Sequence, residues 1–219
     1  MKAAAKRVIG TLNFADYFAV IEFNDYASRV GQSGDRNSPY LLQRASDMNK
    51  ANILKSIDKL LAMGSTNFMS GFEFAFQTFQ QSDSIEQSSG CNQAILFLTD
   101  GEMTDDETAL FNLIDLKRNT YSDSSREPPV MFTYSFGSKA DIEIPKRIAC
   151  EYGGVWSSIE DGGNLAESMG AYYTYFAQGS GSSSGDSVSW AEVSTWPSPL
   201  HHYASSFVID GSTDPLTND

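Results

Sequence analysis

Short apolar runs alternate with amphipathic segments along most of the chain. Runs of this length suit strands buried on both faces of a parallel sheet, and apolar residues three and four apart suit helices that cover it. The predicted strands are residues 17–23, 94–99, 130–137 and 154–159. The predicted helices are residues 2–12, 51–62, 68–79, 104–117, 142–151 and 164–176. This order predicts an α/β fold, a doubly wound and mainly parallel sheet with helices on both faces.

Turn and capping residues refine the pattern at three places. The dipeptide Asn24-Asp25 predicts a turn into a short antiparallel edge strand at 26–30. Gly64 is expected to stop the helix predicted at 51–62. The sequence Thr-Asp-Asp-Glu at 104–107 matches a capping box for the helix that follows it.

The pattern changes near residue 177, which we take as the end of a main domain. Residues 178–187 are rich in Gly and Ser and predict a flexible linker. Residues 188–219 include Trp190, Trp196 and Phe207, but a segment this short cannot supply a core of its own. We expect it to be the start of a following domain or a disordered tail.

Charge and length exclude several classes of partner. With 28 acidic and 15 basic residues the net charge is −13, which argues against nucleic acid or an anionic membrane surface. No apolar run approaches the ~18 residues of a membrane span. The first seven residues are basic without an apolar core behind them, so we do not expect a signal peptide there.

Most enzyme chemistry lacks its residues in the predicted domain. The two histidines, His201 and His202, are adjacent in the tail, which excludes a triad or a zinc site within residues 1–177. The strand–helix turns carry no glycine-rich nucleotide-binding motif. What remains is oxygen chemistry: the Thr66 hydroxyl follows a glycine turn, and the Asp100 carboxylate ends the strand 94–99. If both loops lie at the carboxyl edge of the sheet, this pair suits Mg²⁺, Ca²⁺ or Mn²⁺.

Each candidate also has a structural interpretation. Thr66 could serve only as the cap of the helix that begins at Phe68, and Asp100 only as a turn residue. Two oxygen ligands do not hold a divalent cation tightly, so further ligands must come from elsewhere. Cys91 and Cys150 are too few for a disulfide scaffold, and could bond to each other, to another chain, or to nothing.

Three stretches in this order resemble the von Willebrand factor type A domains. Gly64-Ser65-Thr66-Asn67 with its helix is similar to the second metal loop of the family, and the strand 95–99 with Asp100-Gly101 is similar to the third. Residues 130–137 are similar to the family's next strand. The likeness is greatest to the alpha-two-delta auxiliary subunits of voltage-gated calcium channels, which share the cysteine positions of Cys91 and Cys150 and continue into a Cache domain, as residues 189–193 suggest.

The resemblance implies a non-catalytic, metal-dependent protein-binding module of a cell-surface or secreted protein, outside the cell. Thr66 and Asp100 would be metal ligands, with Ser65, Asn67, Gly101 and Glu102 shaping the loops. Mg²⁺ or Ca²⁺ would sit at the sheet edge, and a carboxylate of a protein partner, for example an ion-channel subunit, would complete its shell. Cys91 and Cys150 are the candidate pair for a disulfide, beside the other two alternatives given above.

The family's Asp-x-Ser-x-Ser motif and the strand before it are missing, since residues 1–3 align with the helix beyond them. The family strand order, 3-2-1-4-5-6, places the missing strand in the centre, between residues 17–23 and 94–99. Two apolar strands would then have unpaired edges. We therefore expect an N-terminally truncated domain that binds cations weakly or not at all.

Two alternatives remain at this point. An intracellular assembly module could have the same fold, and a signal peptide upstream of Met1 would decide against it. A metal-dependent hydrolase using Asp100 would need more acids, for which Glu102, Asp105 and Asp106 are the candidates. The capping box makes the last two better partners for a helix dipole, so we do not expect an enzyme.

Overall fold

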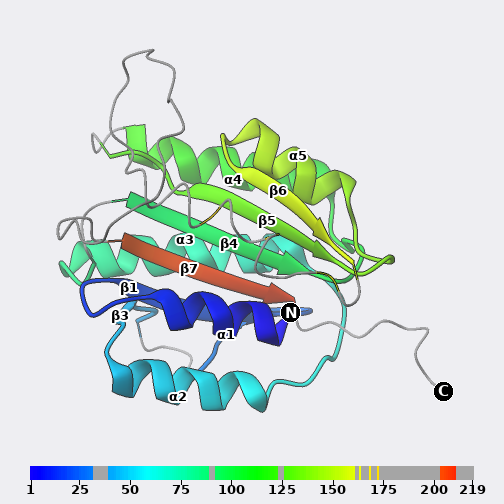
Figure 1. Ribbon diagram of the computed structural model, residues 1–219. Helices are drawn as coiled ribbons and strands as arrows, with labels where there is room; N and C mark the ends of the chain where they lie inside the picture. The colour runs from blue at the N-terminus through cyan, green and yellow to red at the C-terminus, as the bar shows by residue number, and fades with distance from the viewer. Residues whose placement is uncertain are drawn as a thin grey trace, which may run out of the picture.

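One seven-stranded sheet forms the centre of the computed structural model (Figure 1). The structure describes residues 1–31, 39–88, 92–122, 126–160, 163, 168 and 172, and the backbone of 203–210. Along the sheet the strands follow the order β2 (Ala27–Arg29), β1 (Tyr17–Phe23), β7 (Tyr203–Asp210), β4 (Asn92–Thr99), β5 (Val130–Phe136) and β6 (Val155–Ile159). The five strands from β1 to β6 are mutually parallel. The short β2 and β3 (Gln43–Arg44) pair antiparallel with β1.

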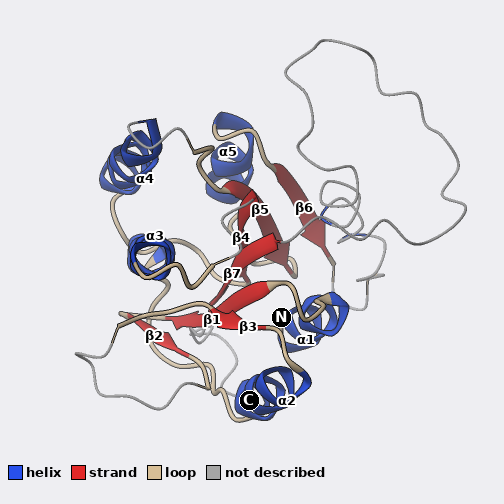
Figure 2. Cartoon of the chain, turned by 90° about the vertical axis from the view of Figure 1, so that its left-hand side faces the viewer, coloured by secondary structure: helices blue, strands red, loops and turns tan. Residues whose placement is uncertain are grey.

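Helices cover both faces of the sheet (Figure 2). On one face lie α1 (Lys2–Thr11) and α2 (Asp47–Asp58), and on the other lie α3 (Phe68–Ser84), α4 (Glu107–Ser122) and α5 (Glu143–Glu151). Each layer encloses its own apolar cluster, because successive residues of a strand point to opposite faces. The α/β doubly wound fold predicted from the sequence is confirmed.

Small residues let α1 lie close to the sheet, and aromatic residues fill the opposite face. Ala4, Ala5 and Val8 of α1 are fully buried against the strands. On the α3 face the ring of Phe97 stacks on those of Phe23 and Phe72, with centroid distances of 5.2 and 4.7 Å. Phe68 meets the same ring edge-on at 4.7 Å. We call Phe23, Phe68, Phe72 and Phe97 the aromatic roof.

The largest departure from the sequence prediction is the centre of the sheet. The position between β1 and β4, which we expected to be vacant, is occupied by β7 from the C-terminal segment (Figure 1). The strand pairs with β1 from Tyr17↔Ala204 to Phe23↔Asp210, and with β4 from Asn92↔Tyr203 to Leu98↔Ile209. The physical reason is that two unpaired apolar strand edges demand a partner, and residues 203–210 supply one.

The first helix after the long loop also differs from its prediction. It begins at Asp47, four residues before the predicted start, because the Ser46 hydroxyl caps it by accepting a hydrogen bond from the Asn49 amide at 3.3 Å. It ends at Asp58, so Gly64 does not stop it. The polar first turn hid the start, and the apolar Leu61, which is 68% exposed, extended the pattern beyond the true end.

Several predictions fall outside the described residues. These are the linker at 178–187, the domain boundary at 177 and most of the helix at 164–176, of which residues 168 and 172 are helical. The tail at 188–219 stays undescribed apart from β7. In the part of the chain that the structure covers, no helix is both long and apolar enough to cross a bilayer.

Candidate functional site

Four loops meet at the carboxyl edge of the parallel strands, which we call the rim. The loop after β1 is joined to the loop before α3 by a hydrogen bond from the Asn67 amide to the Asn24 carbonyl at 3.0 Å. The loop after β4 is joined to the same segment by a bond from the Thr104 amide to the Thr66 carbonyl at 3.1 Å. A third bond, from the Asp141 amide to the Gly101 carbonyl at 3.1 Å, adds the loop after β5. The loops of Thr66 and Asp100 are therefore brought together, as the sequence predicted.

Thr66 is not the helix cap that its position allowed. The cap of α3 is Asn67, whose side-chain oxygen accepts a hydrogen bond from the Ser70 amide at 2.8 Å. Thr66 lies one residue earlier, 4% exposed, in the segment that the Thr104 bond ties to the loop of Asp100. The capping interpretation of Thr66 is wrong, and Asn67 has that role instead of a purely loop-shaping one.

Asp25 is a rim carboxylate that the sequence analysis treated only as a turn residue. Its Oδ1 accepts hydrogen bonds from the Ser65 hydroxyl and, at 3.2 Å, from the Ser65 amide. Gly64, with φ of +83°, lies so close that a Cβ there would stand 2.8 Å from Asp25 Oδ2. Ser65 is thus positioned by Asp25, and Gly64 permits the approach.

We expect Gly64→Ala to destabilise the domain by about 1–2 kcal/mol, because a side chain in the left-handed region is strained and would also displace Asp25. Gly10→Ala is the matched control, since nothing lies within 4 Å of a Cβ at that position on α1. It should raise stability by roughly 0.5–1 kcal/mol. Urea unfolding measures both, and equal effects of the two substitutions would contradict this account.

Asp100 stands exposed directly after β4, whose residues from Gln93 to Thr99 are buried. Its turn is held by Thr99, whose hydroxyl accepts a hydrogen bond from the Gly101 amide at 3.3 Å. Glu102 is exposed on the same loop. Burial lowers the pKa of the Met1 α-amino group, and the negative charge of Asp100 opposes this by raising it. The amino end of α1 therefore faces Asp100 at the rim.

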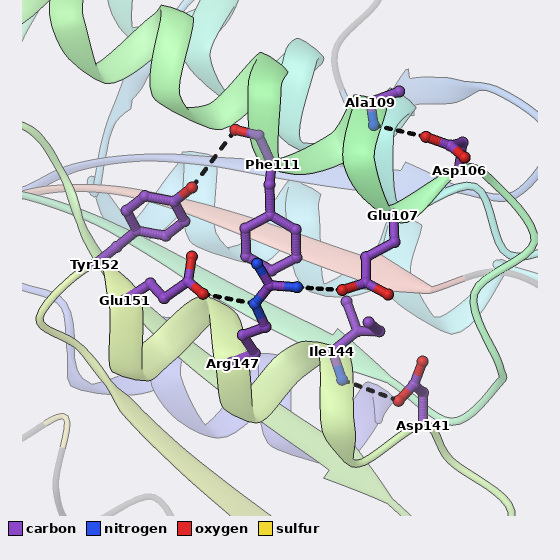
Figure 3. Close-up of polar contacts among 9 residues, drawn as sticks. All are labelled: Asp106, Glu107, Ala109, Phe111, Asp141, Ile144, Arg147, Glu151 and Tyr152. Atoms are coloured by element: carbon purple, nitrogen blue, oxygen red, sulfur yellow. Dashed lines mark hydrogen bonds and ion pairs between the residues drawn. The ribbon is translucent and has the colours of Figure 1, made fainter.

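The acids after Glu102 serve two different helices, which corrects the predicted capping box. The Asp105 carboxylate accepts hydrogen bonds from the Phe68 and Met69 amides of α3 at 2.9 and 2.8 Å. Asp106 caps α4 by accepting from the Ala109 amide at 2.8 Å (Figure 3). Both carboxylates satisfy free amides at helix starts, where the helix dipole favours negative charge. From the sequence alone, a capping box within one helix could not be distinguished from two acids that each bind the start of a different helix.

A polar cluster between α4 and α5 supports this side of the rim (Figure 3). The Arg147 guanidinium pairs with Glu107 and Glu151 and lies 3.9 Å from the ring centroid of Phe111. Tyr152 donates its hydroxyl to Asp115 at 2.9 Å, and burial raises its pKa. The ion pair of Arg147 with Glu107 is half-exposed and links α5 to α4, so it contributes little to stability.

Glu22 is a second rim acid that the sequence analysis did not single out. It interrupts the buried pattern of β1, and burial raises its pKa while the nearby Lys2 opposes the shift. A carboxyl with a raised pKa binds its proton more tightly in the folded than in the unfolded state. The free energy of unfolding therefore falls as pH rises from about 4.5 through the higher folded value.

We expect Glu22→Gln to remove this loss, so the variant should gain stability over wild type above that pH window and not below it. Glu73→Gln, at an exposed glutamate on α3, is the control. Urea midpoints measured from pH 4 to pH 8 would test this. A gain of equal size at every pH would show that charge burial at Glu22 is not the cause.

Comparison with solved structures identifies the architecture. The von Willebrand factor type A protein from Catenulispora acidiphila superimposes with a TM-score of 0.58 at 23% identity, over 76% of this chain and 35% of that one. The chain has the von Willebrand A fold. No family model matches it.

The chain is similar in sequence to calcium-channel subunits. The human voltage-dependent calcium channel subunit alpha-2/delta-2 is 32% identical over 46% of the chain. Human alpha-2/delta-3 is 27% identical over 78%, and human alpha-2/delta-4 is 25% identical over 75%. The chain spans 8% to 15% of the length of these relatives.

No three His, Cys, Asp or Glu side chains of the described residues are grouped to hold a metal. Thr66 and Asp100 remain the two oxygen ligands expected from the sequence, and their loops are joined.

The backbone of β7 adds a third candidate at the rim. Asp210 ends β7 and is in register with Phe23, one position beyond the pair Leu98↔Ile209. It therefore lies at the same edge of the sheet as Asp100. The sequence signal was available, because Phe207-Val208-Ile209 runs into Asp210-Gly211 as β4 runs into Asp100-Gly101.

The structure describes only one of the two cysteines that could form a disulfide. Cys150 is an exposed free thiol in α5, and Cys91 lies outside the described residues. The disulfide between them stays a prediction.

Proposed function

We propose that the chain is a non-catalytic protein-binding module whose rim recognises a partner with the help of a divalent cation. The observation that supports this most is the junction of the loops of Thr66 and Asp100 through the Thr104 bond, on a von Willebrand A fold. Because its relatives are named as calcium-channel subunits, we propose a cell-surface or secreted protein that works outside the cell, with an ion-channel subunit as a candidate partner.

The proposed ligands are Thr66, Asp100 and, from β7, Asp210. Residues 210–212, Asp-Gly-Ser, also have the spacing with which the family's missing motif begins. A hydroxyl and two carboxylates suit Mg²⁺ or Ca²⁺, with water and a partner's carboxylate in the remaining positions. Ser65, Gly101 and Glu102 would shape the loops, and Asp25 would position Ser65.

We propose that binding of the free cation is weak, because few protein ligands face it and the positive end of the α1 helix dipole lies beside Asp100. Calorimetry with Mg²⁺ and Ca²⁺ tests this on the full chain. We expect dissociation constants well above the micromolar range, and sub-micromolar binding would contradict the proposal.

The hydrolase alternative receives less support from the rim acids. Asp105 and Asp106 are each bound to the amides of a helix start, which leaves Glu102 as the candidate acid beside Asp100 in that loop. The intracellular alternative has no observation in its favour.

A further inference from the structure

We propose that the space between β1 and β4 is an exchangeable strand-binding slot, and that residues 203–210 occupy it as a removable strand. The slot accepts an eight-residue parallel strand, paired along both edges. A copy of this segment supplied by another molecule would take the same place.

β7 comes from a segment distant in the sequence from the other strands, since β6 ends at Ile159 and β7 begins at Tyr203. Every other parallel strand is tied to its neighbours in the sequence by a helix that packs on the sheet. β7 is the last described element along the chain. On their other sides β1 keeps β2 and β3, and β4 keeps β5.

The aromatic roof frames the slot from one face independently of β7. Since β1 and β4 are two strand spacings apart, their backbones lie about 9.5 Å from each other. The rings of Phe23 and Phe97 nevertheless stack at 5.2 Å, so these side chains meet across the position of β7. Phe68, from α3, contacts both rings, at 6.1 and 4.7 Å.

The opposite face is bridged in the same way by α1. One buried cluster contains Ala4, Ala5, Val8 and Ile9 of α1 together with residues of both β1 and β4. Among these are Phe18 and Val20 on β1 and Leu96 and Leu98 on β4. Contacts above and below therefore link β1 and β4 across the position of β7.

The exchange can be tested on the full chain with a fluorescein-labelled peptide of residues 201–212. We expect slow, saturable incorporation, measured by anisotropy and by co-migration on a native gel. A peptide of the same composition in scrambled order should not incorporate. No incorporation of the native peptide into the folded chain would overturn the proposal.

A reversible lock shows whether the peptide enters the slot. The pair Ala19↔Ser206 joins β1 to β7 in register, so Ala19→Cys with Ser206→Cys, in a chain with Cys91→Ser and Cys150→Ser, should form a disulfide. The oxidised chain should take up at least tenfold less peptide, and reduction should restore uptake. Equal uptake by the oxidised and reduced chains would overturn the proposal.

A second lock covers the case in which the first variant fails to fold. Ala94→Cys with Ser205→Cys joins β7 to β4 instead, at another pair in register. If neither pair forms a disulfide in a folded chain, β7 is not in the slot and the proposal is wrong. If either lock suppresses uptake reversibly, the proposal is supported.

Discussion

Deletion of residues 203–210 is expected to abolish the cooperative unfolding transition of the domain. These residues pair in register with seven residues of β1 and seven of β4, and they close the centre of the sheet. Without them two long apolar strands keep unpaired amide and carbonyl groups, each costing about 1–3 kcal/mol when left buried. The sum exceeds the roughly 5–15 kcal/mol by which ordinary domains are stable.

The matched control is deletion of residues 211–219, which leaves every described strand intact. Circular dichroism during heating should show a sharp transition for the control. For the deletion of 203–210 it should show a broad loss of signal or aggregation. A sharp transition within a few degrees of wild type in the chain lacking 203–210 would show that β7 is not part of the fold.

The substitution with the second-largest expected effect is Phe97→Ala, at about 3–5 kcal/mol. Phe97 is fully buried in β4, and its ring contacts Phe23, Phe68 and Phe72 at centroid distances of 5.2, 4.7 and 4.7 Å. Removing the ring leaves a cavity where β1, β4 and α3 meet, and the stacking energy of the aromatic pairs is lost in addition.

Leu116→Ala provides the comparison, because Leu116 is 65% exposed on α4. It should change the free energy of unfolding by less than about 0.5 kcal/mol. Denaturant unfolding of both variants gives the two values. A cost below about 1 kcal/mol for Phe97→Ala would mean that the aromatic roof does not hold β1 and β4 together.

Local patterns in the sequence predicted most of the sheet and its helices. The apolar run at 17–23 became β1 with the predicted bounds, and the runs at 94–99 and 130–137 became β4 and β5. The central residues of these strands are buried on both faces of the sheet, which is why they form nearly continuous apolar runs in the sequence. The rim position of Thr66 and Asp100 followed from the rule that open α/β sheets build sites at the carboxyl ends of strands.

What the sequence could not show depends on contacts between distant residues. Residues 203–210 contain adjacent serines in a segment rich in turn residues, and their assignment as a strand comes from the two edges that they pair with. The hydrogen bond from the Phe68 amide of α3 to Asp105 joins residues 37 positions apart, and the hydrogen bond from the Ser65 hydroxyl to Asp25 joins residues 40 positions apart. Local propensity contains no record of such pairs.

The structure adds three acids to the rim that the sequence analysis did not name as site residues. Glu22 lies in β1 and Asp25 lies in the turn after it. The end of β1 comes to lie beside the loops of Thr66 and Asp100 only when the chain folds. Asp210 could have been noticed from its apolar run, but its place at the rim depends on the position of β7 in the sheet. An acid at the end of an apolar run therefore merits attention wherever it occurs in the chain.

The central claim, a cation site between the loops of Thr66 and Asp100, is tested most directly by Mn²⁺ in two-dimensional NMR of the full chain. Paramagnetic broadening should first affect the amides of residues 65–67 and 100–102, and Asp100→Ala should abolish this selectivity while leaving the other signals in place. Broadening that begins elsewhere, or that is unchanged in Asp100→Ala, would contradict the account.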